Sequence, residues 1–323
     1  MYRQAVIDAR GTCRRIWESC GGSRPDATEE QVAAAGAAMV GGLLATVTKC
    51  RALYLPAEVV LAWEPRDHPP EPAGRFAIDP TYKSGRKGKT PGAYYEAEED
   101  TRTFFCALDV LQVYPAAGWE ADDVAATYAS QDGPTLLWSS DHDWLQLVSP
   151  EVHLHRPDCS VRPRGVPPEE WRRPDGILVT PENIREVKTG GVKGLDAEGW
   201  LYYLALVGCK GDGVDGVPGI GATRATALIE ACPLVVDLVL SEQEDEAVAE
   251  VCETNAQLTR FVAKAAAHRE ELQRSLDLVR LRVVGLEVVR PDPAAEKVEA
   301  LRMWLEGMGI WEMGEGLVAC DGF

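Results

Sequence analysis

Residues 135–147 have the sequence Thr-Leu-Leu-Trp-Ser-Ser-Asp-His-Asp-Trp-Leu-Gln-Leu, in which a short apolar run ends at two acids around a histidine. Such a run is typical of a buried strand. Two earlier apolar runs also end at an acid. They are Gln4-Ala-Val-Ile-Asp8 and Glu58-Val-Val-Leu-Ala-Trp63, the second followed by Glu64. The chain therefore contains at least three predicted strands, each followed by a carboxylate.

Helical patterns separate these strands at residues 28–52, 93–113 and 119–130. The first opens with Thr28-Glu-Glu-Gln31, a capping-box sequence that marks a helix start. Apolar strands that alternate with helices predict an α/β fold, with a mostly parallel sheet flanked by helices.

Carboxylates at strand ends are the pattern that indicates chemistry. They are joined by the acids of a predicted helix start, Glu120-Ala-Asp-Asp123. Ligands of an open parallel sheet bind beyond the carboxyl ends of its strands, so we expect these acids to converge. Carboxylates that converge need a positive charge among them, and their oxygens favour Mg²⁺ or Mn²⁺ over zinc. The alternative is structural, because helix dipoles and N-caps account for each acidic group taken alone.

A glycine-rich stretch, Gly208-Cys-Lys-Gly-Asp-Gly-Val-Asp-Gly-Val-Pro-Gly-Ile-Gly221, lies between two predicted helices. It holds Asp212 and Asp215, and it predicts a helix-hairpin-helix. Gly219 and Gly221 allow close approach of the backbone, so the hairpin amides and the next helix N-terminus can hold a DNA phosphate. The alternative is a plain glycine-rich turn.

Composition excludes several classes of protein. The 323 residues include no run of about 18 unbroken apolar residues and no secretory start, so we expect no membrane partner. The nine cysteines form no Cys-x-x-Cys pair, which favours a reducing, cytoplasmic location over a disulfide framework or a zinc ribbon. A net charge of −18 by itself disfavours nucleic acid, but the distribution of charge decides that question.

Residues 80–95 carry four cations and no acid. The run begins Pro-Thr-Tyr82-Lys83-Ser-Gly-Arg86-Lys87-Gly-Lys89, between the second predicted strand and the helix that leads to Glu120. A charge run of this kind is ordinarily a solvated loop. Its place between the acids instead favours contact with phosphate, where a cation offsets the charge that the oxygens gain during cleavage.

These motifs resemble the 5′-nuclease superfamily, which includes the 5′→3′ exonuclease domains of bacterial DNA polymerase I, stand-alone phage 5′ exonucleases and flap endonucleases. The resemblance rests on Glu120–Asp123, on Ser140–Leu147 and on Asp212–Gly221, and it runs from about Ala5 to Ala231. It implies a PIN-like sheet with a helix-hairpin-helix (H3TH) annex. Residues 1–180 would form the catalytic domain, with an arch or gateway near 80–113, and 181–323 the DNA-binding region and helical tail.

The resemblance also implies the site residues. Two or more Mg²⁺ ions, with Mn²⁺ as a substitute, would be held by Asp8, Glu64, Glu120, Asp122, Asp141, Asp143, Asp212 and Asp215, with Asp123 beside them. Lys83 and Arg86 would contact the scissile phosphate. DNA would be bound by Tyr82, Lys87, Lys89, Gly216, Val217, Gly219, Ile220, Gly221, Thr223 and Arg224, with K⁺ expected at the hairpin. Two departures are Glu64, where the family has Asp, and Ala9-Arg-Gly11, where Gly normally follows the first Asp directly.

The expected function is a metal-dependent 5′→3′ exonuclease or 5′-flap endonuclease that acts on DNA with 5′ ends, flaps or nicks and leaves 5′ phosphates. A nuclease of the same fold that removes RNA primers is the nearest alternative, and a catalytically impaired DNA-binding module is the other. We expect a bacterial cell or a phage-infected host as the location. Three roles are open for the acidic tail after residue 240: packing on the sheet, binding of replication proteins, or only solvation of the protein.

Overall fold

The computed structural model describes residues 1–65, 72–85, 90–157, 172–173, 176–187, 192–292 and 303. It divides into two compact units. The first unit comprises Met1–His68, Gly88–Ser140 and Val283–Phe323, and the second comprises Pro69–Lys87 and Asp141–Arg282. Each unit is described by itself. The boundary at residue 180 stays a prediction, since these units group parts of the chain that are distant in sequence.

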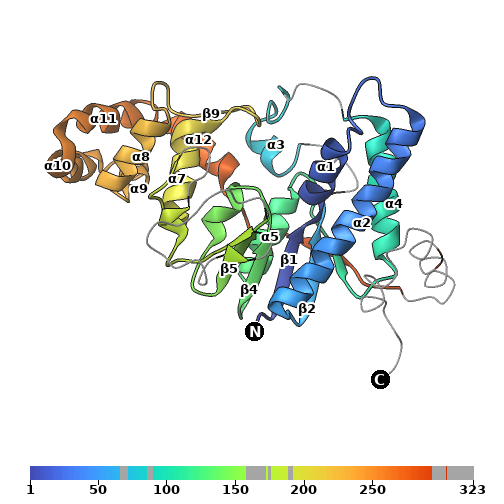
Figure 1. Cartoon of the computed structure of the whole chain (residues 1–323). Coiled ribbons are helices and arrows are strands. Elements are labelled where there is room, and N and C mark those ends of the chain that lie inside the picture. The colour runs from blue at the N-terminus through green and yellow to red at the C-terminus, as the bar shows by residue number, and fades with distance from the viewer. Residues whose placement is uncertain are drawn as a thin grey trace. The chain divides into compact units, whose positions relative to one another are not determined.

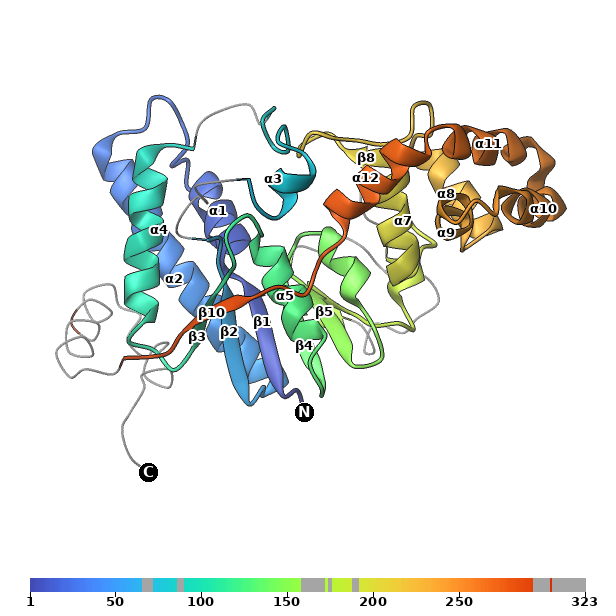
Figure 2. The same ribbon diagram turned by 180° about the vertical axis from the view of Figure 1, so that it is seen from behind.

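The strands of the first unit form a sheet in the order β10-β3-β2-β1-β4 (Figure 2). Their bounds are β1 Gln4–Asp8, β2 Glu58–Ala62, β3 Leu111–Pro115, β4 Thr135–Trp138 and β10 Leu286–Val289. Pairing is parallel except at β10, which runs antiparallel to β3. Every residue of β1, β3 and β4 is buried, which explains why these strands are apolar throughout.

Helices cover both faces of this sheet (Figures 1 and 2). Helices α1 Ala9–Ser19, α2 Glu29–Tyr54 and α4 Gly92–Phe105 lie on one face, and α5 Ala121–Ala129 lies on the other. The capping box of α2 is present as predicted: the Thr28 amide donates to Gln31 Oε1 at 2.9 Å and the Gln31 amide to Thr28 Oγ1 at 3.2 Å. The mostly parallel, helix-flanked α/β sheet is therefore confirmed.

Two elements correct the sequence prediction. The helix expected over 93–113 ends at Phe105, and Leu111–Pro115 is instead the buried strand β3. The helical tail expected within 181–323 contains a strand, because Leu286–Val289 forms the edge strand β10. Both strands are four or five residues long, so periodicity alone does not separate them from helix ends.

Helix α2 is long and apolar enough to cross a membrane by length and composition, with a mean hydropathy of 1.5 over its most apolar window. The sequence prediction missed it because it counted only unbroken apolar runs. Met39, Leu43 and Leu44 are fully buried, and α2 packs on α1 and α4. The apolar composition is thus the one that a core helix needs.

The second unit carries a small antiparallel arrangement and most of the helices. Strand β7 Gly176–Val179 pairs with β5 Val152–Arg156 and β6 Arg172–Arg173. The helical elements are α3 Arg75–Ile78, η1 Asp143–Leu147, η2 Ile184–Glu186, α7 Ala197–Val207, α8 Ala222–Ala231, α9 Val235–Leu240, α10 Glu244–Asn255, η3 Ala256–Leu258, α11 Thr259–Ala267 and α12 Arg269–Val279. Helix α7 packs on η1, α8 and α12.

The predicted hairpin joins α7 to α8. Strands β8 Gly208–Cys209 and β9 Val214–Asp215 form a two-stranded ladder, and the loop from Gly216 to Gly221 leads into α8. Val217 and Ile220 are 2% and 3% exposed, so two apolar side chains anchor this loop to the unit.

Candidate active site

Asp8 ends β1 and is the best-fixed acid of the first unit. Its Oδ1 accepts the Gly11 amide at 2.7 Å, and its Oδ2 accepts the hydroxyl of Ser139 at 2.8 Å. A Cβ at residue 11 would lie 2.2 Å from Oδ2, so only glycine fits this turn. The departure at Ala9-Arg-Gly11 therefore keeps a required glycine, three residues after the acid. Sequence reasoning missed Ser139, because nothing local links it to a residue 131 positions away.

The acids of α5 divide by burial. Asp123 is fully buried and its Oδ2 accepts the Glu120 amide at 3.0 Å, which is the helix-capping role that the structural alternative expects. Glu120 and Asp122 are partly exposed. Glu64 lies two residues beyond the end of β2 and is also partly exposed. Four acids of the first unit therefore keep some exposure to solvent. Two follow strands and two lie at the start of α5: Asp8, Glu64, Glu120 and Asp122.

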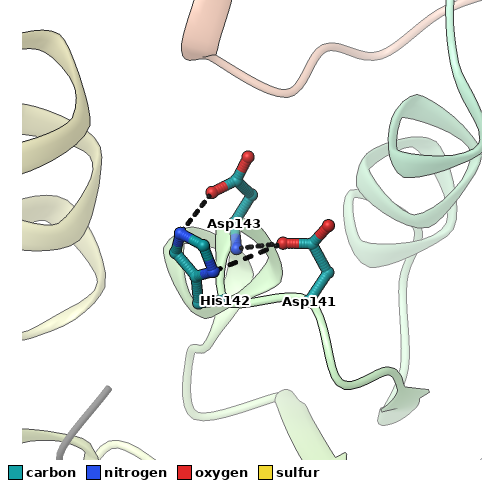
Figure 3. Close-up of side chains that lie close together, drawn as sticks. All are labelled: Asp141, His142 and Asp143. Atoms are coloured by element: carbon teal, nitrogen blue, oxygen red, sulfur yellow. Dashed lines mark hydrogen bonds and ion pairs between the residues drawn. The ribbon is translucent and has the colours of Figure 1, made fainter. Parts of the chain in front are cut away.

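In the second unit, Asp141, His142 and Asp143 form a cluster whose ligand atoms all lie within 4.8 Å of one another (Figure 3). The Asp143 amide donates to Asp141 Oδ1 at 2.9 Å. His142 lies between the two acids, with Nε2 3.4 Å from Asp143 Oδ1 and Nδ1 3.8 Å from Asp141 Oδ1. Sequence reasoning did not single out His142, because the family pattern leaves that position open.

Asp212 lies at the same side of the second unit as this cluster. Burial, together with the carboxylates of Asp212 and Asp143, raises the pKa of the Cys209 thiol to about 11, because each disfavours a negative charge on the sulfur. Both acids therefore lie close to one thiol. Asp215 is exposed at the end of β9, and its carbonyl accepts the hydroxyl of Ser275.

Lys83 is tied to the Asp212 loop. Its amide donates to the Asp212 carbonyl at 2.7 Å, and its φ of 59° is in the left-handed region. Tyr82 is 5% exposed and packs edge-on against Phe76 at 5.8 Å between ring centroids. Stacking of Tyr82 on DNA stays a prediction. Arg86, Lys87 and Lys89 lie outside the described residues.

The hairpin between α7 and α8 carries backbone amides and a cationic side chain. The amides of Val217 and Ile220 donate to the carbonyls of Leu206 and Val217. Among the hairpin residues that the structure describes, the amides of Gly219, Gly221 and Thr223 donate to no protein acceptor. Arg224 donates from Nη1 to the Gly219 carbonyl at 2.7 Å. The amide donors available to a phosphate are therefore fewer than the sequence suggested.

Two further cations lie beside this hairpin. The Lys264 Nζ of α11 would be 2.6 Å from a Cβ on Gly219. Arg260 and Arg224 both stack on the Phe261 ring, at 4.7 and 4.9 Å. Neither Arg260 nor Lys264 was predicted, because both lie about 40 residues downstream in an otherwise acidic helical segment.

The donor chemistry fits hard divalent cations. The clustered ligand atoms of Asp141 and Asp143 are carboxylate oxygens, which suit Mg²⁺ or Mn²⁺. Both oxygens of Asp8 are likewise carboxylate donors, held in place by the Gly11 amide and the Ser139 hydroxyl. The prediction that all nine acids gather at one point stays a prediction, because they are divided between the two units.

The sequence was also compared with known protein families and proteins. Residues 3–171 match the family described as 5′-3′ exonuclease, N-terminal resolvase-like domain. The thermostable DNA polymerase I of Thermus filiformis is 28% identical over 247 residues, which are 73% of this chain, and the chain spans 25% of that polymerase. Flap endonuclease Xni of Shewanella pealeana is 26% identical over 242 residues, covering 72% of this chain and 84% of its own length.

Among solved structures, the bacteriophage T5 D15 flap endonuclease in a pseudo-enzyme–product complex with DNA and metal ions has a similar fold. It aligns with a TM-score of 0.57 at 18% identity and covers 97% of this chain and 99% of that one. The similarity extends over both units of the chain.

Proposed function

The chain belongs to the family of 5′-3′ exonucleases with an N-terminal resolvase-like domain, and from this premise we propose that it hydrolyses DNA phosphodiesters near 5′ ends and at 5′ flaps. The products would carry 5′ phosphates. The observation that carries this proposal is the hydrogen bond between Lys83 and Asp212, because it joins the predicted phosphate-contacting segment to a loop of predicted metal ligands.

The proposed metal ligands are the acids that sequence analysis named. Two or more Mg²⁺ ions, with Mn²⁺ as a substitute, would be held by Asp8, Glu64, Glu120, Asp122, Asp141, Asp143, Asp212 and Asp215. When bound, such ions supply an activated water and neutralise charge on the leaving oxygen. Asp123 would support Glu120 through the α5 cap rather than bind directly. K⁺ at the hairpin stays a prediction.

The chain's own residues bind and orient the DNA. The ammonium of Lys83 would offset the negative charge that builds on phosphate oxygens as the bond breaks. Its backbone is held by Asp212, so its place is set by the same loop that carries an acid. Ser139 and the Gly11 amide hold the Asp8 carboxylate in one orientation.

The hairpin would hold duplex backbone without reading its sequence. The exposed amides of Gly219, Gly221 and Thr223 suit phosphate oxygens, and Arg224 adds a cation beside them. The wider DNA-binding role of residues 181–323, the binding of replication proteins by the acidic tail, and a cytoplasmic location in a bacterial or phage-infected cell belong to this proposal.

A cleavage assay on end-labelled DNA tests the function. Flap, nicked and single-stranded substrates are incubated with Mg²⁺, with Ca²⁺ and with EDTA. We expect 5′-phosphate products with Mg²⁺ only, and preference for DNA over a matched RNA flap. The double variant Asp141→Ala/Asp143→Ala should bind flap DNA in EDTA as wild type does but cleave none. Full cleavage by that variant would refute the site, and an inactive wild type that binds flaps would favour the DNA-binding module.

A further inference from the structure

A buried carboxylate outside the predicted site joins helices α4 and α1 of the first unit. Glu98 of α4 is 4% exposed, and its Oε2 accepts a hydrogen bond from Arg102 Nη2 at 3.2 Å. Its Oε1 accepts the hydroxyl of Tyr94 at 3.1 Å and lies 3.8 Å from Arg10 Nε. A charge removed from water is costly unless it is paired and hydrogen-bonded, so this arrangement constrains every member.

The contact of Glu98 with Arg102 extends to Glu64. Glu64 lies beyond Ala62, the last residue of β2 that pairs with β1, so the sheet does not fix it. The Trp63 amide is held by the Val113 carbonyl at 3.0 Å. Arg102 then contacts both residues, with its guanidinium 5.0 Å from the Trp63 ring and its Nη2 3.5 Å from the Glu64 carbonyl oxygen. Arg102 therefore contacts the backbone that carries Glu64.

The contact of Glu98 with Arg10 reaches the turn that follows Asp8. Arg10 lies two residues after Asp8, in the first turn of α1. Its Nε lies 3.8 Å from Glu98 Oε1. Arg10 is thus the ion-pair partner of Glu98, and it belongs to the same turn in which the Gly11 amide donates to Asp8.

We propose that Glu98 is a positioning residue of the metal site: it holds Arg102 against the Glu64 backbone and Arg10 beside Asp8, and so fixes two strand-end carboxylates relative to each other. The inference rests on the proposed function, since it assigns a purpose to the spacing of two proposed ligands. Removal of a residue that orients metal ligands without binding the metal typically lowers metal affinity or activity 10–100-fold.

The test compares two isosteric variants on one helix. Glu98→Gln removes the buried charge, and Glu96→Gln makes the same change at an exposed position of α4. Mn²⁺ binding is measured by isothermal titration calorimetry without DNA, after circular dichroism has verified folding. We expect affinity to fall about 10–100-fold in Glu98→Gln and to stay within about twofold of wild type in Glu96→Gln.

A second variant covers the case in which Glu98→Gln does not fold. Arg102→Lys keeps the positive charge but loses the planar fork that reaches both Glu98 and the Glu64 carbonyl. We expect weaker Mn²⁺ binding again, and cleavage by either folded variant should recover as Mn²⁺ is raised. Because both variants are shown by circular dichroism to be folded without the metal, that recovery reports a loss of metal affinity and not a loss of folding. Wild-type Mn²⁺ affinity in the folded variants would overturn the inference.

The outcomes also separate this inference from the proposed function. Wild-type protein that binds Mn²⁺ but cleaves no DNA would refute the function, and the Glu98→Gln comparison would still decide the inference. Wild-type protein that cleaves DNA while Glu98→Gln binds Mn²⁺ normally would refute the inference alone. Wild-type protein that binds no Mn²⁺ would refute both.

Discussion

The amide of Lys83 donates a 2.7 Å hydrogen bond to the carbonyl oxygen of Asp212, which is 129 residues further along the chain. Lys83 adopts a φ of 59°, which is unfavourable for a residue with a Cβ. A hydrogen bond that holds a residue in an unfavourable conformation indicates that its place is set by its surroundings. The turn between β8 and β9 therefore determines where the Lys83 backbone lies.

The first prediction concerns the glycine beside this bond. Gly213 has a φ of 74°, and a Cβ there would lie 3.7 Å from the Lys83 amide nitrogen. Gly213→Ala should cost about 1 kcal/mol in unfolding free energy and should lower the cleavage rate by shifting the turn. Gly211→Ala, where a Cβ would contact nothing within 4 Å, is the control and should leave both unchanged. Equal effects in the two variants would contradict the proposed link.

The second prediction concerns the Lys83 side chain. Lys83→Ala should reduce kcat on flap DNA by about 10²–10³-fold, because one charge-stabilising donor is removed from the phosphate. Flap binding in Ca²⁺ should change little. Lys210→Ala, which removes an exposed lysine from the β8–β9 turn that Lys83 contacts, should cleave at the wild-type rate. A Lys83→Ala variant whose loss lies entirely in KM would show that Lys83 binds substrate without aiding cleavage.

The third prediction concerns Ser139. Ser139→Ala removes the hydroxyl that donates to Asp8 Oδ2, and it should weaken Mn²⁺ binding about tenfold. Ser130→Ala is matched, since the Ser130 hydroxyl donates to the Thr127 carbonyl at the far end of α5. Calorimetry on both variants checks this, and equal affinity in Ser139→Ala and wild type would show that Asp8 does not need this support.

The fourth prediction concerns the hairpin cations. Lys264→Ala should weaken duplex binding and should reduce the slope of log affinity against log salt by about one, as expected for one lost phosphate contact. Lys193→Ala removes an exposed lysine elsewhere in the second unit and should leave the slope unchanged. Fluorescence anisotropy over a salt series measures both slopes. An unchanged slope in Lys264→Ala would place Lys264 outside the DNA interface.

Local patterns predicted the elements whose stability is local. The apolar runs of β1, β2 and β4 and the Thr28 capping box follow from short stretches of sequence, and the structure has them where expected. The β3 strand was missed because its five residues continue an apolar helix pattern, and only burial between β2 and β10 distinguishes it.

The site residues that directly follow a strand, or that lie in the glycine-rich turn, could be predicted from the sequence. Asp8, Asp141 and Asp212 could be singled out in this way. Ser139 and Lys264 could not, because each acts on a residue far away in sequence and belongs to no local motif. The left-handed conformation of Lys83 also depends on a contact with a distant loop, so propensity alone would not predict it.

The most direct test of the account is the location of bound Mn²⁺ in a crystal of this protein, by anomalous scattering. We expect Mn²⁺ peaks within bonding distance of carboxylate oxygens of Asp8 and of Asp141 and Asp143. Crystals of Asp141→Ala/Asp143→Ala should show no peak at the position of residues 141 and 143. A crystal soaked in Mn²⁺ in which these carboxylates bind no ion would contradict it.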